Sequence, residues 1–327
     1  MPVSCEVTQT RRGLSTRGLQ RAVWIALALL VVSLAGFGGY YYWDRYVRLR
    51  DRSAIDINID HLEQAVRKDP SKPETRSALA EGYMRKGLHD KAYEQSMQIL
   101  SAYPDNQSAL LVAGISAARL RRPEAALQSL QKLVAARRDQ PMAKVDNALQ
   151  MAYYFEGESY LMLDDPADAI VALKGALEIS ATDADAYYQL GLAYQASGKP
   201  QEAVEQFNNA ARFVPDYAEA YQAMIDSYSA LGQTDHVAYA KGMHAFSVSD
   251  YETAKTNLER VTRASPSFAP AFVGLGLTYE KLGQWQQAMT AVKQSLELQP
   301  DGFAAQQALR RIESTMNDAQ VKGKNNG

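Results

Sequence analysis

Residues 191–215 read GLAYQASGKPQEAVEQFNNAARFVP, and residues 276–300 read GLTYEKLGQWQQAMTAVKQSLELQP. Both segments place Gly, Tyr, Gly, Ala and Pro at the same spacing, Gly-x2-Tyr-x3-Gly-x4-Ala-x11-Pro. The two copies begin 85 residues apart, which is two and a half times a period of 34 residues. A fixed period of this length indicates helical hairpins that stack on one another in an array.

Each residue of the motif has a structural explanation. We expect Gly191 and Ala203 where two helices cross too closely for larger side chains, and Tyr194 between neighbouring units. Gly198 should end the first helix in a left-handed conformation that residues with a Cβ resist. Pro215 should end the second helix. The motif therefore predicts a fold and no chemistry of its own.

The 34-residue period is broken at two places. Nine additional residues, 141–149, precede one unit, and we expect them to lengthen its first helix, because Met142, Val145 and Leu149 have helical spacing. A half-unit, 218–234, precedes another, so the helix over residues 235–248 should close one unit and open the next. The complete units are 73–106, 107–140, 150–183, 184–217, 235–268 and 269–302.

Other segments flank the units. Residues 53–72 have one apolar helix face and are predicted to be a capping half-repeat. The array with its C-terminal capping helix covers residues 73–316. Residues 317–327 are polar and predicted to be a disordered tail. Residues 1–21 form an Arg-rich tail ahead of an apolar segment.

These motifs resemble the tetratricopeptide repeat (TPR) family over about residues 53–316. The resemblance implies an all-α, right-handed α-solenoid of helix-turn-helix units, whose concave face binds peptides or partner proteins. Two units depart from the family pattern: Ala117 and Arg138 replace the aromatic residue and the last Pro of one, and Asp164 and Ala181 replace the turn Gly and the last Pro of the other.

Residues 22–43 contain no charged residue and end in an aromatic cluster. As a helix at about 1.5 Å per residue they would extend about 33 Å, which is enough for a hydrocarbon core of about 30 Å. The segment is predicted to be one transmembrane helix. A signal peptide cleaved after Ser33-Leu34-Ala35 is the alternative.

The flanks of this segment do not fix its orientation, because each carries four Arg. A short basic tail usually stays in the cytoplasm, so we expect residues 1–21 to be cytoplasmic and the repeats extracytoplasmic. The predicted location is a bacterial inner membrane, with residues 22–43 as a single-pass anchor.

Charge and residue content exclude several kinds of function. Residues 53–327 contain 27 Lys and Arg against 34 Asp and Glu, with no basic stripe, which argues against nucleic-acid binding. Cys5 is the only cysteine, and it precedes the apolar segment. The nearest histidines, His236 and His244, are two helical turns apart. We therefore predict no catalytic residue, no metal site, no cofactor and no enzyme activity.

The TPR resemblance implies a groove lined by first helices. At the corresponding positions this sequence has mostly apolar and aromatic side chains, with scattered acidic residues such as Glu158. Such a groove would suit an amphipathic or basic segment of a partner. The alternative is that the aromatic residues pack against adjacent helices. The predicted groove residues are Tyr154, Leu161, Tyr188, Leu192, Tyr239, Met243 and Phe246.

These observations predict a membrane-anchored TPR scaffold that binds a protein or peptide partner and assists assembly or maturation of envelope proteins. Two alternatives remain. One is an accessory structural subunit of a membrane enzyme complex. The other resembles the repeat subunit of cytochrome c maturation systems, which holds an apocytochrome.

Overall fold

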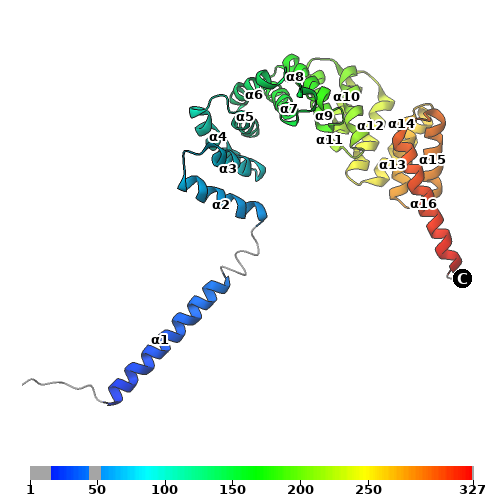
Figure 1. Ribbon diagram of the computed structural model, residues 1–327. Helices are drawn as coiled ribbons and strands as arrows, with labels where there is room; N and C mark the ends of the chain where they lie inside the picture. The colour runs from blue at the N-terminus through cyan, green and yellow to red at the C-terminus, as the bar shows by residue number, and fades with distance from the viewer. Residues whose placement is uncertain (1–15, 44–52, 326–327) are drawn as a thin grey trace, which may run out of the picture. The chain divides into compact units, whose positions relative to one another are not determined.

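The computed structural model describes residues 16–43 and 53–325, and these residues contain α-helices, a short 3-10 turn and no strand (Figure 1). This confirms the predicted all-α fold. The chain divides into two compact units, Met1–Lys68 and Asp69–Gly327, which we describe separately.

The first unit contains α1 (Thr16–Tyr42) and α2 (Ala54–Lys68). Residues Val23–Tyr42 are long and apolar enough to cross a membrane, a test that a signal sequence also passes. In α2 only Ile59 is buried. Residues 1–15 and 44–52, which hold most of the predicted cytoplasmic tail and the second charged flank, lie outside the described residues. The capping role of residues 53–72 stays a prediction.

The second unit is a succession of antiparallel helices joined by short turns (Figure 1). In chain order its helices are α3 (Pro73–Arg85), α4 (His89–Ala102), α5 (Gln107–Arg119), α6 (Pro123–Arg137), α7 (Asn147–Met162), α8 (Pro166–Ile179), α9 (Ala184–Ala196), α10 (Pro200–Phe213), α11 (Ala218–Ala230), α12 (Thr234–Ser247), α13 (Tyr251–Ala264), α14 (Ala269–Lys281), α15 (Trp285–Leu298) and α16 (Phe303–Asn325).

Glycine permits close crossings and tight turns in these hairpins, as the motif predicts. A Cβ on Gly191 would lie 2.4 Å from a ring carbon of Phe207, and a Cβ on Gly276 would lie 2.4 Å from Val292 Cγ2. Gly198 has a φ of +68°, in the left-handed region. Ala203 is completely buried, which confirms the expected crossing of α9 and α10.

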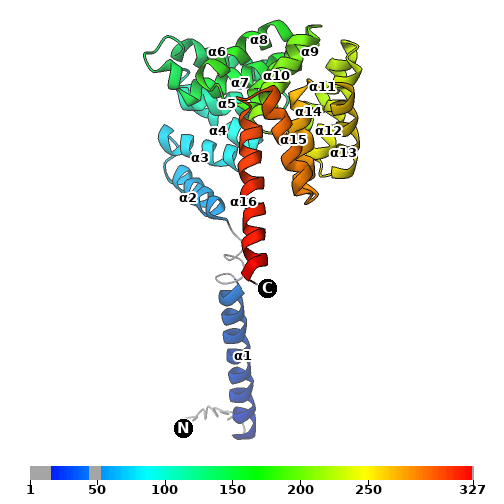
Figure 2. The same ribbon diagram turned by 90° about the vertical axis from the view of Figure 1, so that its right-hand side faces the viewer.

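The helices form two layers over most of the array. The first helices α3, α5, α7, α9 and α11 contact one another in succession, and they lie on the inner side of the curve that the hairpins describe (Figure 1). At α12 the alternation changes: α12 packs against α11 and α13 and also contacts α14, which in turn contacts α16 (Figure 2). This confirms that one helix closes a unit and opens the next.

The structure corrects the expectation for residues 141–149. Instead of lengthening α7 over its whole length, this segment forms the 3-10 turn η2 (Ala143–Val145), and α7 begins at Asn147. Asp146 caps α7 by accepting hydrogen bonds from the backbone N–H groups of Ala148 and Leu149. Met142 and Val145 are consequently exposed, at 68% and 64%.

The C-terminal region also differs from its prediction. The apolar face of α16 is buried at Ala305, Ala308 and Ile312, as expected of a capping helix. The helix then continues to Asn325, through most of the segment 317–327 that we expected to be disordered. Residues 317–322 contain neither Gly nor Pro, the residues that most oppose helix formation, although the helix also includes Gly323.

Candidate functional site

The strongest candidate for a binding site lies where α7, α9 and the start of α11 meet in the layer of first helices. Tyr154 on α7 and Tyr188 on α9 are 34 residues apart and occupy equivalent positions in successive hairpins. Both are half-buried, so each packs against neighbouring helices and still presents part of its ring to solvent.

A third tyrosine connects α9 to the start of α11. The Tyr217 ring centroid lies 5.2 Å from that of Tyr188, and the Tyr188 ring also contacts Phe207 at 5.9 Å. The Tyr217 hydroxyl donates a 2.7 Å hydrogen bond to Asp185 Oδ1. Burial and the neighbouring Asp185 carboxylate raise the pKa of Tyr217, so this phenol stays neutral and remains a donor.

A cavity of about 160 Å³ opens between α5, α7 and α9. Its wall is formed by Arg119, Gln150, Met151, Tyr154, Asp183 and Asp185. Gln150 Nε2 donates to Asp183 Oδ2 at 2.6 Å, which ties the start of α7 to the cap of α9. Burial, followed by the charge of Glu158, raises the pKa of Tyr154 to about 12.

Arg119 forms one side of this cavity and is already paired. Its Nη1 lies 3.2 Å from Glu158 Oε1, and its guanidinium lies 4.9 Å from the centroid of the Phe155 ring. Burial raises the pKa of Glu158, and Arg119 opposes that effect. Arg119 is therefore paired within the protein, whereas the two other charged residues of the wall, Asp183 and Asp185, have no ion-pair partner among the described residues.

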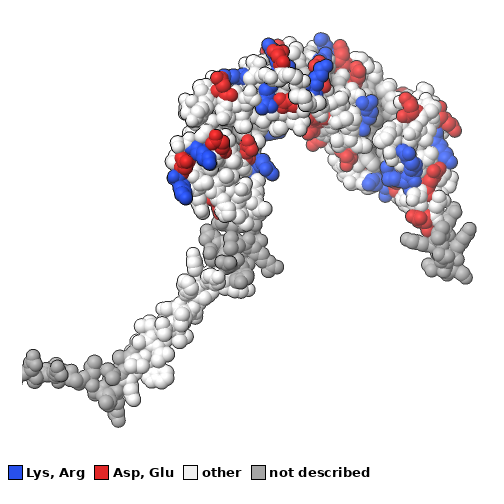
Figure 3. Space-filling model, in the orientation of Figure 1, with Lys and Arg blue, Asp and Glu red and all other residues white. Residues whose placement is uncertain are grey.

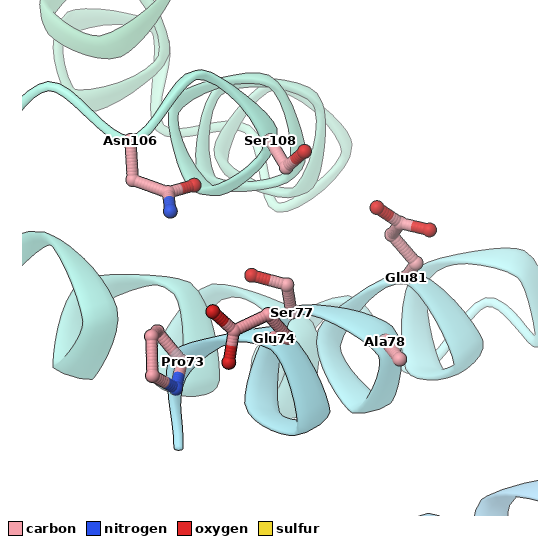
Figure 4. Close-up of a pocket in the computed structure, with 7 residues that line it drawn as sticks. All are labelled: Pro73, Glu74, Ser77, Ala78, Glu81, Asn106 and Ser108. Atoms are coloured by element: carbon pink, nitrogen blue, oxygen red, sulfur yellow. The ribbon is translucent and has the colours of Figure 1, made fainter. Parts of the chain in front are cut away.

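A second cavity, of about 320 Å³, lies between α3 and α5 (Figure 4). Polar residues dominate its lining: Glu74 and Ser77 on α3 lie across the cavity from Asn106, and Glu81 lies further along α3 (Figure 4). It occupies the same place between successive first helices as the cavity at Tyr154. Open space between first helices is therefore a recurrent property of this layer.

A third cavity, of about 280 Å³, lies between α14 and α15. Phe272, Leu275 and Tyr279 supply apolar and aromatic surface, and glutamine side chains of α15 surround it. None of the predicted groove residues lines this cavity.

Leu161 and Leu192 are half-buried beside the hydrophobic core clusters of their hairpins. Part of each side chain packs between helices, as the alternative interpretation requires, and part remains accessible. Their role in a groove stays a proposal.

The structure corrects the prediction for Tyr239, Met243 and Phe246, which are buried at 6%, 3% and 8% exposure. The ring of Tyr239 packs against Phe268 at 5.0 Å, and the ring of Phe246 packs against Tyr251 at 5.7 Å. Because α11, α13 and α14 surround α12, these side chains fill the core and cannot line an open groove.

Asp185 and Tyr217 are not among the groove residues predicted from the sequence. The 34-residue period aligns Asp185 with Met151, and Tyr217 with Asp183, so both occupy repeat positions that also line the cavity in the preceding unit. The prediction considered apolar positions within the first helices, whereas Asp185 is acidic and Tyr217 lies one residue before α11. Acidic residues next to tyrosines at repeat-equivalent positions would have indicated the site.

Two of the four histidines have identified structural surroundings. The His236 ring packs between Tyr228 and Phe268, at centroid distances of 5.1 and 4.7 Å. Burial and nearby Arg119 lower the pKa of His89. Among the residues that the structure describes, no three His, Cys, Asp or Glu side chains are grouped so that they could hold a metal ion.

On the face shown in Figure 3, acidic and basic side chains are interspersed over the second unit.

The stacked hairpins with an open inner layer define an α-solenoid repeat protein. Residues 160–227 and 245–312 match the family model described as tetratricopeptide repeat. This match confirms, over these two segments, the resemblance found in the motif. Proteins of this family typically act as scaffolds for protein partners. No curated protein matches the sequence.

Several solved structures are similar to this chain. A crystal structure of MamA protein has 25% sequence identity, covers 59% of this chain and 95% of its own, and has a TM-score of 0.44. A TPR protein from Parabacteroides merdae ATCC 43184 has 17% identity and a TM-score of 0.46, and the match covers 84% of this chain and 98% of that protein. YrrB, described as a TPR protein with an unusual peptide-binding site, has 17% identity and a TM-score of 0.38, and the match covers 76% of this chain and 97% of YrrB.

Proposed function

We propose that this protein is a non-enzymatic, membrane-anchored scaffold whose first-helix layer binds a segment of a protein partner and thereby assists assembly or maturation of envelope proteins. One observation carries the proposal: open cavities lie between successive first helices, at α3–α5 and at α5–α7–α9. In a solenoid, this layer presents one continuous surface on which an extended or helical segment can contact several repeats.

The half-buried tyrosines support this use of the layer. Tyrosine contributes a large contact area with few rotatable bonds, and its hydroxyl can form a hydrogen bond with a partner. It is therefore enriched among the interface residues that contribute most of the binding energy. Tyr154 and Tyr188 are held by neighbouring rings before any partner arrives. A preorganised contact surface lowers the entropy lost on binding.

The apolar α1 supports the membrane anchor, and we propose that the repeats lie outside the cytoplasm. Reporter fusions at the C-terminus test the orientation. An alkaline phosphatase fusion should be active and a green fluorescent protein fusion exported through the same pathway should be dark. The reverse pattern would place the repeats in the cytoplasm and exclude a role in envelope maturation.

The binding proposal is tested by recovering partners from membranes that contain the full chain. Replacement of both Tyr154 and Tyr188 by Ala should reduce partner recovery, measured by quantitative mass spectrometry, by about tenfold or more. Val171→Ala is the matched control, because Val171 is 70% exposed on α8, in the other layer. Equal recovery with the double variant and the wild type would refute the proposed binding face.

Exchange kinetics separate a scaffold from a permanent subunit. A scaffold should release a labelled partner and take up an unlabelled one during incubation. A partner that copurifies in fixed stoichiometry and does not exchange would instead identify an accessory subunit of a membrane complex.

A further inference from the structure

We propose that the cavity between α5, α7 and α9 receives a basic side chain, Lys or Arg, of the bound partner segment, with the carboxylates of Asp183 and Asp185 and the ring of Tyr154 as its contacts. This inference rests on the proposed function and names the chemistry of the partner at one position. It is distinct from that function, because a groove can bind a partner without a cation at this point.

The size of the cavity matches one side chain. Its volume of about 160 Å³ is well below the range of about 300–1,000 Å³ that is usual for pockets enclosing a whole small ligand. It opens on the surface of the first-helix layer, where a passing segment could insert a side chain and keep its backbone outside. Met151 and the Tyr154 ring offer apolar wall for the methylenes of a long side chain.

Neither carboxylate on the α9 side of the cavity has a charged side-chain partner, although Asp183 caps the N-terminus of α9 and Asp185 lies in its first turn. Asp183 accepts hydrogen bonds from the Ala186 backbone N–H at 3.0 Å and from the Gln150 amide, and Asp185 accepts one from the Tyr217 hydroxyl. All of these donors are neutral. Among the described residues, no Lys, Arg or His lies within ion-pair distance of either carboxylate.

Arg119, the one positively charged residue that lines the cavity, does not pair with Asp183 or Asp185. Arg119 is paired with Glu158 at 3.2 Å and held against the Phe155 ring, so its charge is balanced on the α5–α7 side. An incoming carboxylate would gain Arg119 only in competition with Glu158, and it would face Asp183 and Asp185. An incoming cation meets two carboxylates with neutral partners, which is the more favourable outcome.

The aromatic component strengthens the preference for a cation. A cation close to the face of a tyrosine ring is attracted by the ring quadrupole. Glu219 adds a further carboxylate near Tyr188, where it contributes to raising the pKa of that phenol after the larger effect of burial. Asp185 on α9 and Glu219 on α11 therefore place further carboxylates beside the tyrosines of this surface.

A peptide selection tests this inference. The probe is a phage-displayed library of short random peptides, applied to the full chain in detergent micelles. Selected peptides should be enriched in Lys or Arg. Their affinity, measured by fluorescence anisotropy, should fall about tenfold in the double variant Asp183→Asn, Asp185→Asn. Asn is as good a helix cap as Asp, so this variant should keep the start of α9.

The control is Asp139→Asn, which removes an 86% exposed carboxylate that does not line the cavity. It should leave the affinity unchanged. Equal weakening by this control and by the cavity variant would show a general charge effect and overturn the inference.

Other outcomes separate this inference from the proposed function. Peptides that lack basic residues, or that are insensitive to the carboxylate variant yet are lost with Tyr154→Ala and Tyr188→Ala, would overturn the cation site and leave the groove intact. Enrichment in acidic residues would assign recognition to Arg119 and would also overturn it. Peptides insensitive to both the carboxylate and the tyrosine variants would contradict both proposals.

Discussion

The hairpin α7–α8 and the hairpin α9–α10 have the same architecture, but they stabilise it differently. The residue before the close-crossing glycine is Leu190 in α9 and Glu156 in α7, and both are buried. The turn residue is Gly198 in one hairpin and Asp164 in the other, and both have a positive φ, of +68° and +57°. The backbone of α7–α8 is thus retained although two of its side chains oppose it.

The comparison shows how a solenoid tolerates unfavourable residues. Each hairpin is packed between two neighbours, so its stability is partly supplied by the interfaces on either side. Glu156 is 6% exposed, and its Oε1 has no hydrogen-bond partner. Burial raises its pKa to about 7. Contacts with the adjacent units can therefore offset the cost of these two residues in α7–α8.

The largest effect is expected when Leu190 of α9 is replaced by Glu, the residue at the equivalent position of α7. Leu190→Glu would place a carboxylate at 2% exposure with no charged partner, and should lower the free energy of unfolding by about 3–5 kcal/mol at about pH 8. Urea unfolding of the full chain in micelles, followed by circular dichroism, measures this. A loss no greater than that of Leu190→Gln would contradict a charge effect.

The reverse change should stabilise α7–α8. Because the folded-state pKa of Glu156 is about 7 and its ordinary value is 4.5, the folded form binds the proton more tightly, and the free energy of unfolding falls as pH rises from about 4.5 to about 7. The total loss is about 3 kcal/mol. Glu156→Leu should therefore gain about 3 kcal/mol at about pH 8 and much less at about pH 4.

Glu156→Gln is the control for this prediction. It should remove the part of the pH dependence that Glu156 contributes, without adding apolar contacts. A difference in unfolding free energy between the wild type and Glu156→Gln that is the same at both pH values would show that the folded protein does not raise the pKa of Glu156.

A moderate effect is expected at the close crossing of the two helices within the α9–α10 hairpin. Ala203 is completely buried where α9 and α10 pack together, and Ala203→Leu should overpack this crossing at a cost of about 1–3 kcal/mol. Glu205→Leu, at an exposed position of the same helix, should change stability by less than about 0.5 kcal/mol. Equal thermal unfolding of the two variants would argue against this packing.

The smallest effects are expected at the turns. Asp164→Gly relieves a left-handed residue with a Cβ and should stabilise the protein by about 0.5–1 kcal/mol, while Gly198→Asp should destabilise it by a similar amount. The denaturation midpoints of the two variants should move in opposite directions. Shifts of the same sign would show that the turns are not equivalent.

The parts of the fold that were predictable are those that a single residue type imposes on the backbone. Gly191 and Gly198 mark a crossing and a turn that larger residues oppose, so their spacing revealed the hairpins. Residues 141–149 were not predictable in the same way, since helical spacing of Met142 and Val145 also fits an exposed turn closed by the Asp146 cap.

The candidate site was only partly predictable. Tyr154 and Tyr188 follow from their repeat positions, but the sequence does not show which neighbours cover a side chain. Tyr239 occupies a comparable position on α12, and the half-unit places α11, α13 and α14 around it, so it is buried. Burial in an irregular array depends on contacts between units, and the period alone does not specify them.

Site-specific photo-crosslinking tests the central claim most directly. A photoreactive phenylalanine analogue placed at Tyr188, in the full chain in membranes, should crosslink to a partner, while the same analogue at Val171 on α8 should not. Both positions are accessible, but they lie on different helix layers. Crosslinks from position 188 alone are the predicted result. A partner captured from position 171 and not from position 188 would contradict the account.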